Sequence, residues 1–170
     1  MSGGLPEYLD LTKAGNTPLM VAGNLSLSRM PRLCAALADS GGQVSVDLQL
    51  FKEGGLAVVS GRVQASLGLT CQRCFRPMRY PVDATMRLAW SGSPQSTAQV
   101  PGSYEQLDSN DGRVKLAELV EDELLLALPL AARHAKADDC SAQPARRTET
   151  EGVAEPGTRP FEILKTLRRH

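Results

Sequence analysis

The sequence predicts an α+β domain in which an antiparallel β-sheet meander packs against two or three helices. Three segments alternate apolar and polar side chains with a period of two, which is typical of strands with one buried face. They cover residues 44–51, 57–71 and 80–90. Two further segments carry apolar residues at helical spacing and supply helices to cover that face. A disordered linker before a C-terminal helical tail completes the predicted architecture.

Length and composition restrict the possible functions. The chain has 170 residues, of which 42% are hydrophobic, enough for one domain with a real core. Its 19 basic and 19 acidic residues balance, so any nucleic-acid contact requires a local basic patch. Aromatic residues make up only 4%, too few for rows of stacking rings. Without a visible signal peptide or an apolar run of about 20 residues, we expect a cytoplasmic protein with reduced cysteines and no membrane partner.

The first helix is expected shortly after an irregular or short-strand lead-in that is rich in Gly and Pro. Ser28 is suited to cap this helix, and Pro31 is tolerated in a first turn. The glycines at 41 and 42 end it. Its apolar face would comprise Met30, Leu33, Cys34 and Leu37.

The strands come next, and the side chains expected on their buried face include Val63, Leu67, Val82 and Leu88. Residues 91–112 predict a long loop, because Gly, Ser, Pro, Asn and Asp dominate them. A second helix is predicted over 115–128 and ends at Pro129. Its apolar face comprises Leu116, Leu119, Val120, Leu124 and Ala127. The opposite face comprises Glu118, Glu121, Asp122 and Leu125.

We therefore expect three regions: one α+β domain over 1–140, a flexible linker over 141–158 and a basic tail over 159–170. The linker is polar and carries little apolar content. The tail places Phe161, Leu164 and Leu167 at helical spacing.

The pair Cys71 and Cys74 is the sharpest chemical feature and has three interpretations. A thioredoxin-type redox pair would need its first thiol at a helix N-terminus, but here a strand precedes the pair. A metal site would need two more ligands, and His134 and Cys140 form the one plausible second pair, giving a Cys3His zinc site. The third interpretation is a turn that carries two reduced thiols without a ligand. Spacing alone leaves the metal site and the plain turn open.

Four separated segments resemble a known family. They are LGLTCQRCFRPM around the cysteine pair, the helix ELVEDELLLALPL, the stretch from His134 to Cys140, and the terminal RPFEILKTLRR. Together and in this order they look like the YceD family, the large ribosomal RNA subunit accumulation proteins. The chain departs from the family pattern at Lys115, where an acidic residue is common, and in the less β-branched residues 130–133.

The resemblance implies a bacterial cytoplasmic protein that supports the synthesis, processing or stability of 23S ribosomal RNA. The implied partner is ribosomal RNA or a precursor of the large subunit, together with other ribosome-assembly proteins. No catalytic activity comes with the family, so we expect that the chain is not an enzyme.

Local charge suggests where RNA would bind. Residues 71–90 and residues 159–170 each carry a net charge of +3, whereas residues 105–123 carry −5. Arginines and lysines that face phosphates give such patches their affinity. The candidate RNA-binding residues are Arg73, Arg76, Arg79, Lys165, Arg168 and Arg169. Ordinary solvated charge is the plainer explanation of any single cluster.

Three functions follow from these features. The favoured one is a non-enzymatic ribosome biogenesis factor that binds ribosomal RNA or a large-subunit precursor. The second is a protein-binding adaptor that docks through the acidic helix face around Glu118, Asp122 and an exposed Leu125. The third is an enzyme, either a thiol redox protein or a nuclease, although no catalytic set for a nuclease stands out.

A structural ion pair is also predicted, between Glu123 and Arg73. On the helical wheel Glu123 falls within the apolar face, between Leu119 and Ala127. A carboxylate in that position must be paired, hydrogen-bonded or protonated. A helix rotated so that Glu123 reaches water is the alternative.

Overall fold

The computed structural model describes residues 4–92, 100–136 and 139–140. These residues belong to one compact unit, Met1–Cys140. The predicted linker over 141–158 and the predicted tail over 159–170 lie outside the described residues. The tail includes three of the candidate RNA-binding residues: Lys165, Arg168 and Arg169. None of the helices in the described part of the chain is long and apolar enough to cross a membrane.

Five strands form the central sheet in the order β2-β3-β4-β5-β6. Their bounds are Leu19–Ser26 (β2), Gln43–Glu53 (β3), Leu56–Thr70 (β4), Pro77–Trp90 (β5) and Glu105–Gln106 (β6). Consecutive strands from β2 to β5 pair antiparallel, whereas β6 runs parallel to the end of β5. The three strands predicted from alternation are therefore confirmed as β3, β4 and β5, except that the second ends one residue earlier than predicted, at Thr70.

Two parts of the chain are more regular than predicted. The lead-in contains the eight-residue strand β2 and also β1 (Tyr8–Asp10). β1 pairs with β7 (Arg113–Lys115) in a second, two-stranded sheet, and the predicted loop 91–112 contains β6. Only Val21 and Leu25 of β2 are buried. The strand therefore carries too little alternation to be recognised, and its pairing with β3 defines it.

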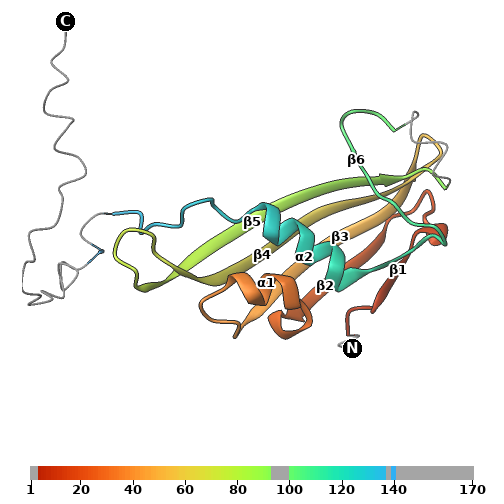
Figure 1. Ribbon diagram of the computed structural model, residues 1–170. Coiled ribbons are helices and arrows are strands. Elements are labelled where there is room, and N and C mark those ends of the chain that lie inside the picture. Colours follow the sequence, from red (N-terminus) through yellow and green to blue (C-terminus); the bar gives the residue numbers. More distant parts are fainter. Residues whose placement is uncertain (1–3, 93–99, 137–138, 141–170) are drawn as a thin grey trace, which may run out of the picture. The chain divides into compact units, whose positions relative to one another are not determined.

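The α-helices of the described residues lie on one face of the central sheet (Figure 1). They are α1 (Pro31–Ala36) and α2 (Leu116–Leu126). The strand residues Val63, Leu67, Val82 and Leu88 are buried as predicted, between 0% and 5% exposed. They belong to one cluster with helix residues that include Leu33, Leu116, Val120 and Leu124. Removal of this apolar surface from water is the main force that joins the helices to the sheet.

The first helix is shorter than predicted. Residues Leu27–Arg29 form a separate 3-10 turn, in which the Ser26 hydroxyl accepts the backbone N–H of Ser28 at 3.3 Å. The α-helix begins only at Pro31, because proline fits the first helical position but blocks a helix that continues through it. It ends at Ala36, well before the glycines, since the next residues pair with the end of β4 through Ala38 N–H and Gly68 O, 2.8 Å apart.

Glu121 on α2 is buried, contrary to the prediction that it points outward. Its side chain is 2% exposed and accepts the backbone N–H of Leu33 at 3.0 Å. The Arg32 guanidinium lies 2.9 Å from the same carboxylate and 2.8 Å from that of Asp122. The prediction failed because α1 covers this side of α2, which gives the second helix two buried faces. A buried carboxylate with both a donor and a cation is satisfied, so it holds the two helices together.

Glu121→Ala is expected to lower the free energy of unfolding by about 2 kcal/mol, because it leaves the buried N–H of Leu33 without an acceptor. Urea denaturation of the purified chain measures this loss. Asp122→Ala is the matched control: it also removes a partner of Arg32, but the Asp122 side chain is 57% exposed and its removal strands no buried group. Equal losses for the two variants would contradict the assignment to Leu33.

Candidate metal centre

The cysteine pair lies in the connection between β4 and β5, here called the cysteine loop (residues 71–76). The last pair of the β4–β5 ladder is Thr70 with Pro77, so the loop begins where the ladder ends. Two backbone hydrogen bonds close it. Cys71 N–H donates to Arg76 O at 2.9 Å, and Phe75 N–H donates to Cys71 O at 2.8 Å. The loop therefore has a fixed backbone at the tip of a long hairpin.

A second segment, residues 130–136, lies beside the cysteine loop after the chain leaves α2 (Figure 1). Gln72 N–H donates to Ala132 O at 2.7 Å. Ala132 is 7% exposed, so this contact is protected from water. Arg73 Nη2 donates to Lys136 O at 3.0 Å. These contacts bring the histidine of this segment, and Cys140 beyond it, to the hairpin tip.

Four potential ligands meet at this point: Cys71, Cys74, His134 and Cys140. One ligand atom from each lies within 4.8 Å of the others. Cys71 Sγ and Cys140 Sγ are 3.8 Å apart, and His134 Nδ1 lies 3.6 Å from Cys74 Sγ and 3.3 Å from Cys140 Sγ. The ligand set predicted from spacing is thus brought together by the fold.

These separations suit a tetrahedral zinc ion. With Zn–S bonds of about 2.3 Å and Zn–N bonds of about 2.0 Å, tetrahedral angles put sulfurs about 3.8 Å apart and nitrogen about 3.5 Å from sulfur. The separations between Cys71 and Cys140 and between Cys74 and His134 match these values. His134 faces the cluster through Nδ1, so Nδ1 is the atom that would bind. Three sulfurs and one imidazole form a closed structural set, without an open position for substrate.

The surroundings of the thiols also favour metal binding, because a ligand cysteine must be deprotonated. Burial raises the pKa of Cys71, but the backbone N–H groups of Cys74, Arg73 and His134 outweigh it and lower the pKa to about 5. Burial raises the pKa of Cys140, against a hydrogen bond from Arg73 Nε at 3.0 Å that stabilises its thiolate. The loop backbone and one arginine thus supply the donors that a thiolate cluster needs.

The predicted pair between Glu123 and Arg73 is not formed. Arg73 uses its guanidinium on Cys140 and Lys136 instead. Glu123 is half-buried, and burial followed by the charges of Glu105 and Asp122 raises the pKa of its carboxyl. The buried carboxylate that needs a partner is two residues earlier, at Glu121, and α1 supplies that partner. The helical wheel of α2 alone cannot show this, since it does not include α1.

The remaining predicted RNA-binding residues of the cysteine loop region are exposed. Arg76 lies at the end of the loop, and Arg79 follows in β5. The Arg79 side chain is 58% exposed and forms one surface ion pair, with Asp39 at 2.8 Å. Arg73 is also exposed, but its donors are directed at the thiol cluster. Arg73 therefore contacts the thiol cluster, whereas Arg76 and Arg79 lie on the exposed surface beside it.

The alternative functions receive less support from the geometry. No helix begins at the cysteine pair, so neither thiol lies at a helix N-terminus. On the proposed acidic face, Glu118 is paired with Lys115 and Asp122 with Arg32. Leu125 is not exposed as predicted but packs partly against the core, because α2 is covered on two sides.

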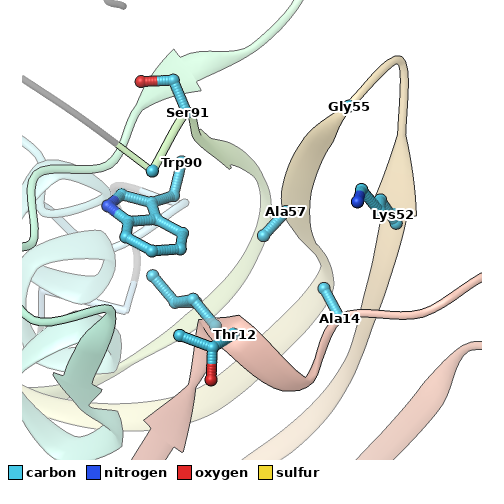
Figure 2. A pocket seen from close by; sticks show the side chains of 9 residues that line it. Thr12, Ala14, Lys52, Gly55, Ala57, Trp90 and Ser91 are labelled. Atoms are coloured by element: carbon cyan, nitrogen blue, oxygen red, sulfur yellow. The ribbon is translucent and has the colours of Figure 1, made fainter. Parts of the chain in front are cut away.

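A small cavity of about 130 Å³ lies at the opposite end of the sheet, beside the turn between β3 and β4 (Figure 2). The indole of Trp90 borders it, but the indole N–H already donates to Ser109 O at 3.0 Å. Lys52 is the only ionisable side chain among the described residues that line it. This cavity offers no cluster of reactive groups comparable to the four ligands at the hairpin tip.

Comparisons with known proteins match this chain to a protein family and to individual relatives. The sequence model of a family described as "Large ribosomal RNA subunit accumulation protein YceD" matches residues 59–168. A Haemophilus influenzae protein named "Large ribosomal RNA subunit accumulation protein YceD" is 26% identical over 171 residues, which covers 97% of each chain. No solved structure matches significantly. The family match includes the cysteine loop, α2 and all four potential ligands.

Proposed function

This chain belongs to the YceD family of large ribosomal RNA subunit accumulation proteins, and we propose that it supports the accumulation of 23S ribosomal RNA without catalysing a reaction. It would act in the cytoplasm, by binding the RNA or a large-subunit precursor. One observation carries the proposal: the fold holds the cysteine loop rigidly at the hairpin tip, with Arg76 and Arg79 accessible beside it.

Electrostatics supports this surface as the RNA contact. The ten residues from 71 to 80 contain three arginines and no acidic residue. Phosphate contacts supply most of the affinity of RNA-binding proteins and fix their orientation, and arginine binds phosphate through two parallel hydrogen bonds. The chain as a whole is neutral, so local basic segments such as this one would have to provide the attraction.

We further propose that zinc fills the Cys3His centre and fixes the loop. Two ligands come from the cysteine loop and two from the segment after α2, so the ion would join elements about 60 residues apart. The role of the ion would be structural, since protein atoms would occupy all four of its coordination positions. The thiols and the imidazole are thereby assigned to the metal rather than to redox or acid–base chemistry.

The full chain, purified without chelator, is expected to contain one zinc ion per molecule by elemental analysis. Cys74→Ser and Cys140→Ser should lose that stoichiometry, because three ligands hold zinc far less tightly than four. Cys34→Ser is the matched control, since its thiol donates to Leu27 O at 3.0 Å and lies outside the cluster. Chelation should lower the free energy of unfolding by about 4 kcal/mol relative to protein with free zinc at about 1,000 times Kd. Wild-type protein without stoichiometric metal would contradict the zinc proposal.

For RNA binding, the double variant Arg76→Gln/Arg79→Gln should bind purified 23S ribosomal RNA more weakly than the wild type. The slope of log K against log salt should fall by about 2, because each phosphate contact contributes about 1. Filter binding between about 50 and 200 mM salt measures both quantities.

Arg62→Gln is the matched control for this experiment. Arg62 is 57% exposed and forms one ion pair with an aspartate, as Arg79 does, but it lies in the middle of β4. It should leave affinity and slope unchanged. An unchanged slope in the double variant would indicate that the RNA does not contact the cysteine loop. It would favour association with the large-subunit precursor through a protein partner.

A further inference from the structure

Phe75 is an exposed aromatic residue at the tip of the cysteine loop. Its side chain is 72% exposed, although phenylalanine is usually buried in folded proteins. It lies directly between Cys74, a potential ligand, and the exposed Arg76. The ring is therefore presented to solvent by the same loop that carries the basic surface.

The backbone at Phe75 is unfavourable for a bulky side chain. Its φ angle is +55°, in the left-handed region, and among the described residues it is the only non-glycine with a positive φ. Glycine or asparagine would adopt this conformation at lower cost. The hydrogen bonds Phe75 N–H to Cys71 O and Cys71 N–H to Arg76 O impose it. A strained conformation that projects an apolar ring into water stabilises neither the loop nor the core, which points to a binding role.

An unpaired nucleobase is the partner that fits this ring. A base offers a flat face for stacking, and the phosphates on either side of it would meet Arg76 and Arg79. A base inside an A-form duplex cannot stack on a side chain, because its neighbours cover both faces. One ring in a basic loop therefore suits a loop, bulge or single-stranded end of RNA.

We propose that Phe75 stacks on one unpaired base of the bound RNA while the neighbouring arginines hold its phosphates. This inference rests on the proposed function and specifies the RNA: single-stranded nucleotides are preferred over duplex. The aromatic content of 4% excludes rows of stacking rings but not a single platform.

The test compares binding of the full, metal-replete chain to a labelled single-stranded RNA of about 16 nucleotides and to the same strand annealed to its complement. Phe75→Asn removes the ring and accepts the backbone conformation, so the loop should keep its fold. We expect affinity for the single strand to fall about tenfold. The salt slope should stay unchanged, since no charge is lost. Phe75→Tyr should bind as the wild type does, and duplex binding should be unaffected.

Arg76→Gln is the matched control for this test, because it alters the adjacent side chain and should lower the salt slope by about 1. Phe75→Gly serves as a second ring-removing variant with an unstrained backbone. Phe75→Asn and Phe75→Gly should both melt at or above the wild-type midpoint temperature, because each relieves the backbone strain at residue 75.

The outcomes separate this inference from the proposed function. A wild type that binds neither of these two RNAs would overturn the stacking inference, whereas a wild type that also fails to bind 23S ribosomal RNA and large-subunit precursors would contradict the proposed function. A wild type with salt-dependent binding, but with ring-removing variants of equal affinity, would overturn the stacking inference alone. Equal weakening of single-strand and duplex binding would also overturn it. The stacking inference would likewise be overturned if the ring-removing variants kept their RNA affinity but no longer cofractionated with large-subunit precursors. In that case the ring would contact a ribosomal protein.

Discussion

The β4–β5 ladder is the constraint on which the site depends. It pairs fourteen consecutive residues, from Ala57 with Trp90 to Thr70 with Pro77. Side chains in a strand alternate between faces, so a shift of one strand by one residue would move its apolar set to the opposite face of the sheet. The buried residues Val63 and Val82 therefore fix the register. That register in turn determines where the ladder ends and the cysteine loop begins.

A second set of contacts determines what meets the loop. The buried carboxylate of Glu121 fixes α2 against α1, and α2 then delivers the following segment to the hairpin tip. There Gln72 N–H and Ala132 O join the two backbones. The ligand set is thus assembled by sheet register, helix packing and one backbone hydrogen bond. A preassembled site loses less conformational entropy when the ion binds.

Patterns that depend on one element could be predicted from the sequence, whereas contacts between elements could not. Alternation identified β3, β4 and β5, and the scarcity of histidine and cysteine left one ligand set. The environment of Glu121 depends on α1, which the helical wheel of α2 does not contain. Similarly, the left-handed backbone at Phe75 arises from two hydrogen bonds across the loop. The residue type gives no sign of it, because a bulky side chain disfavours this conformation.

The division of the arginines also has an electrostatic consequence. In the proposed complex, Zn²⁺ with three thiolates and a neutral imidazole has one net negative charge, which Arg73 faces through Cys140. Arg76 and Arg79 then contribute positive charge to the surface beside the loop. Without the ion, each deprotonated thiol adds uncompensated negative charge close to these arginines and repels phosphate. In the proposed complex, zinc would therefore have two effects: it would hold the loop in place and leave its surface positive enough to attract RNA.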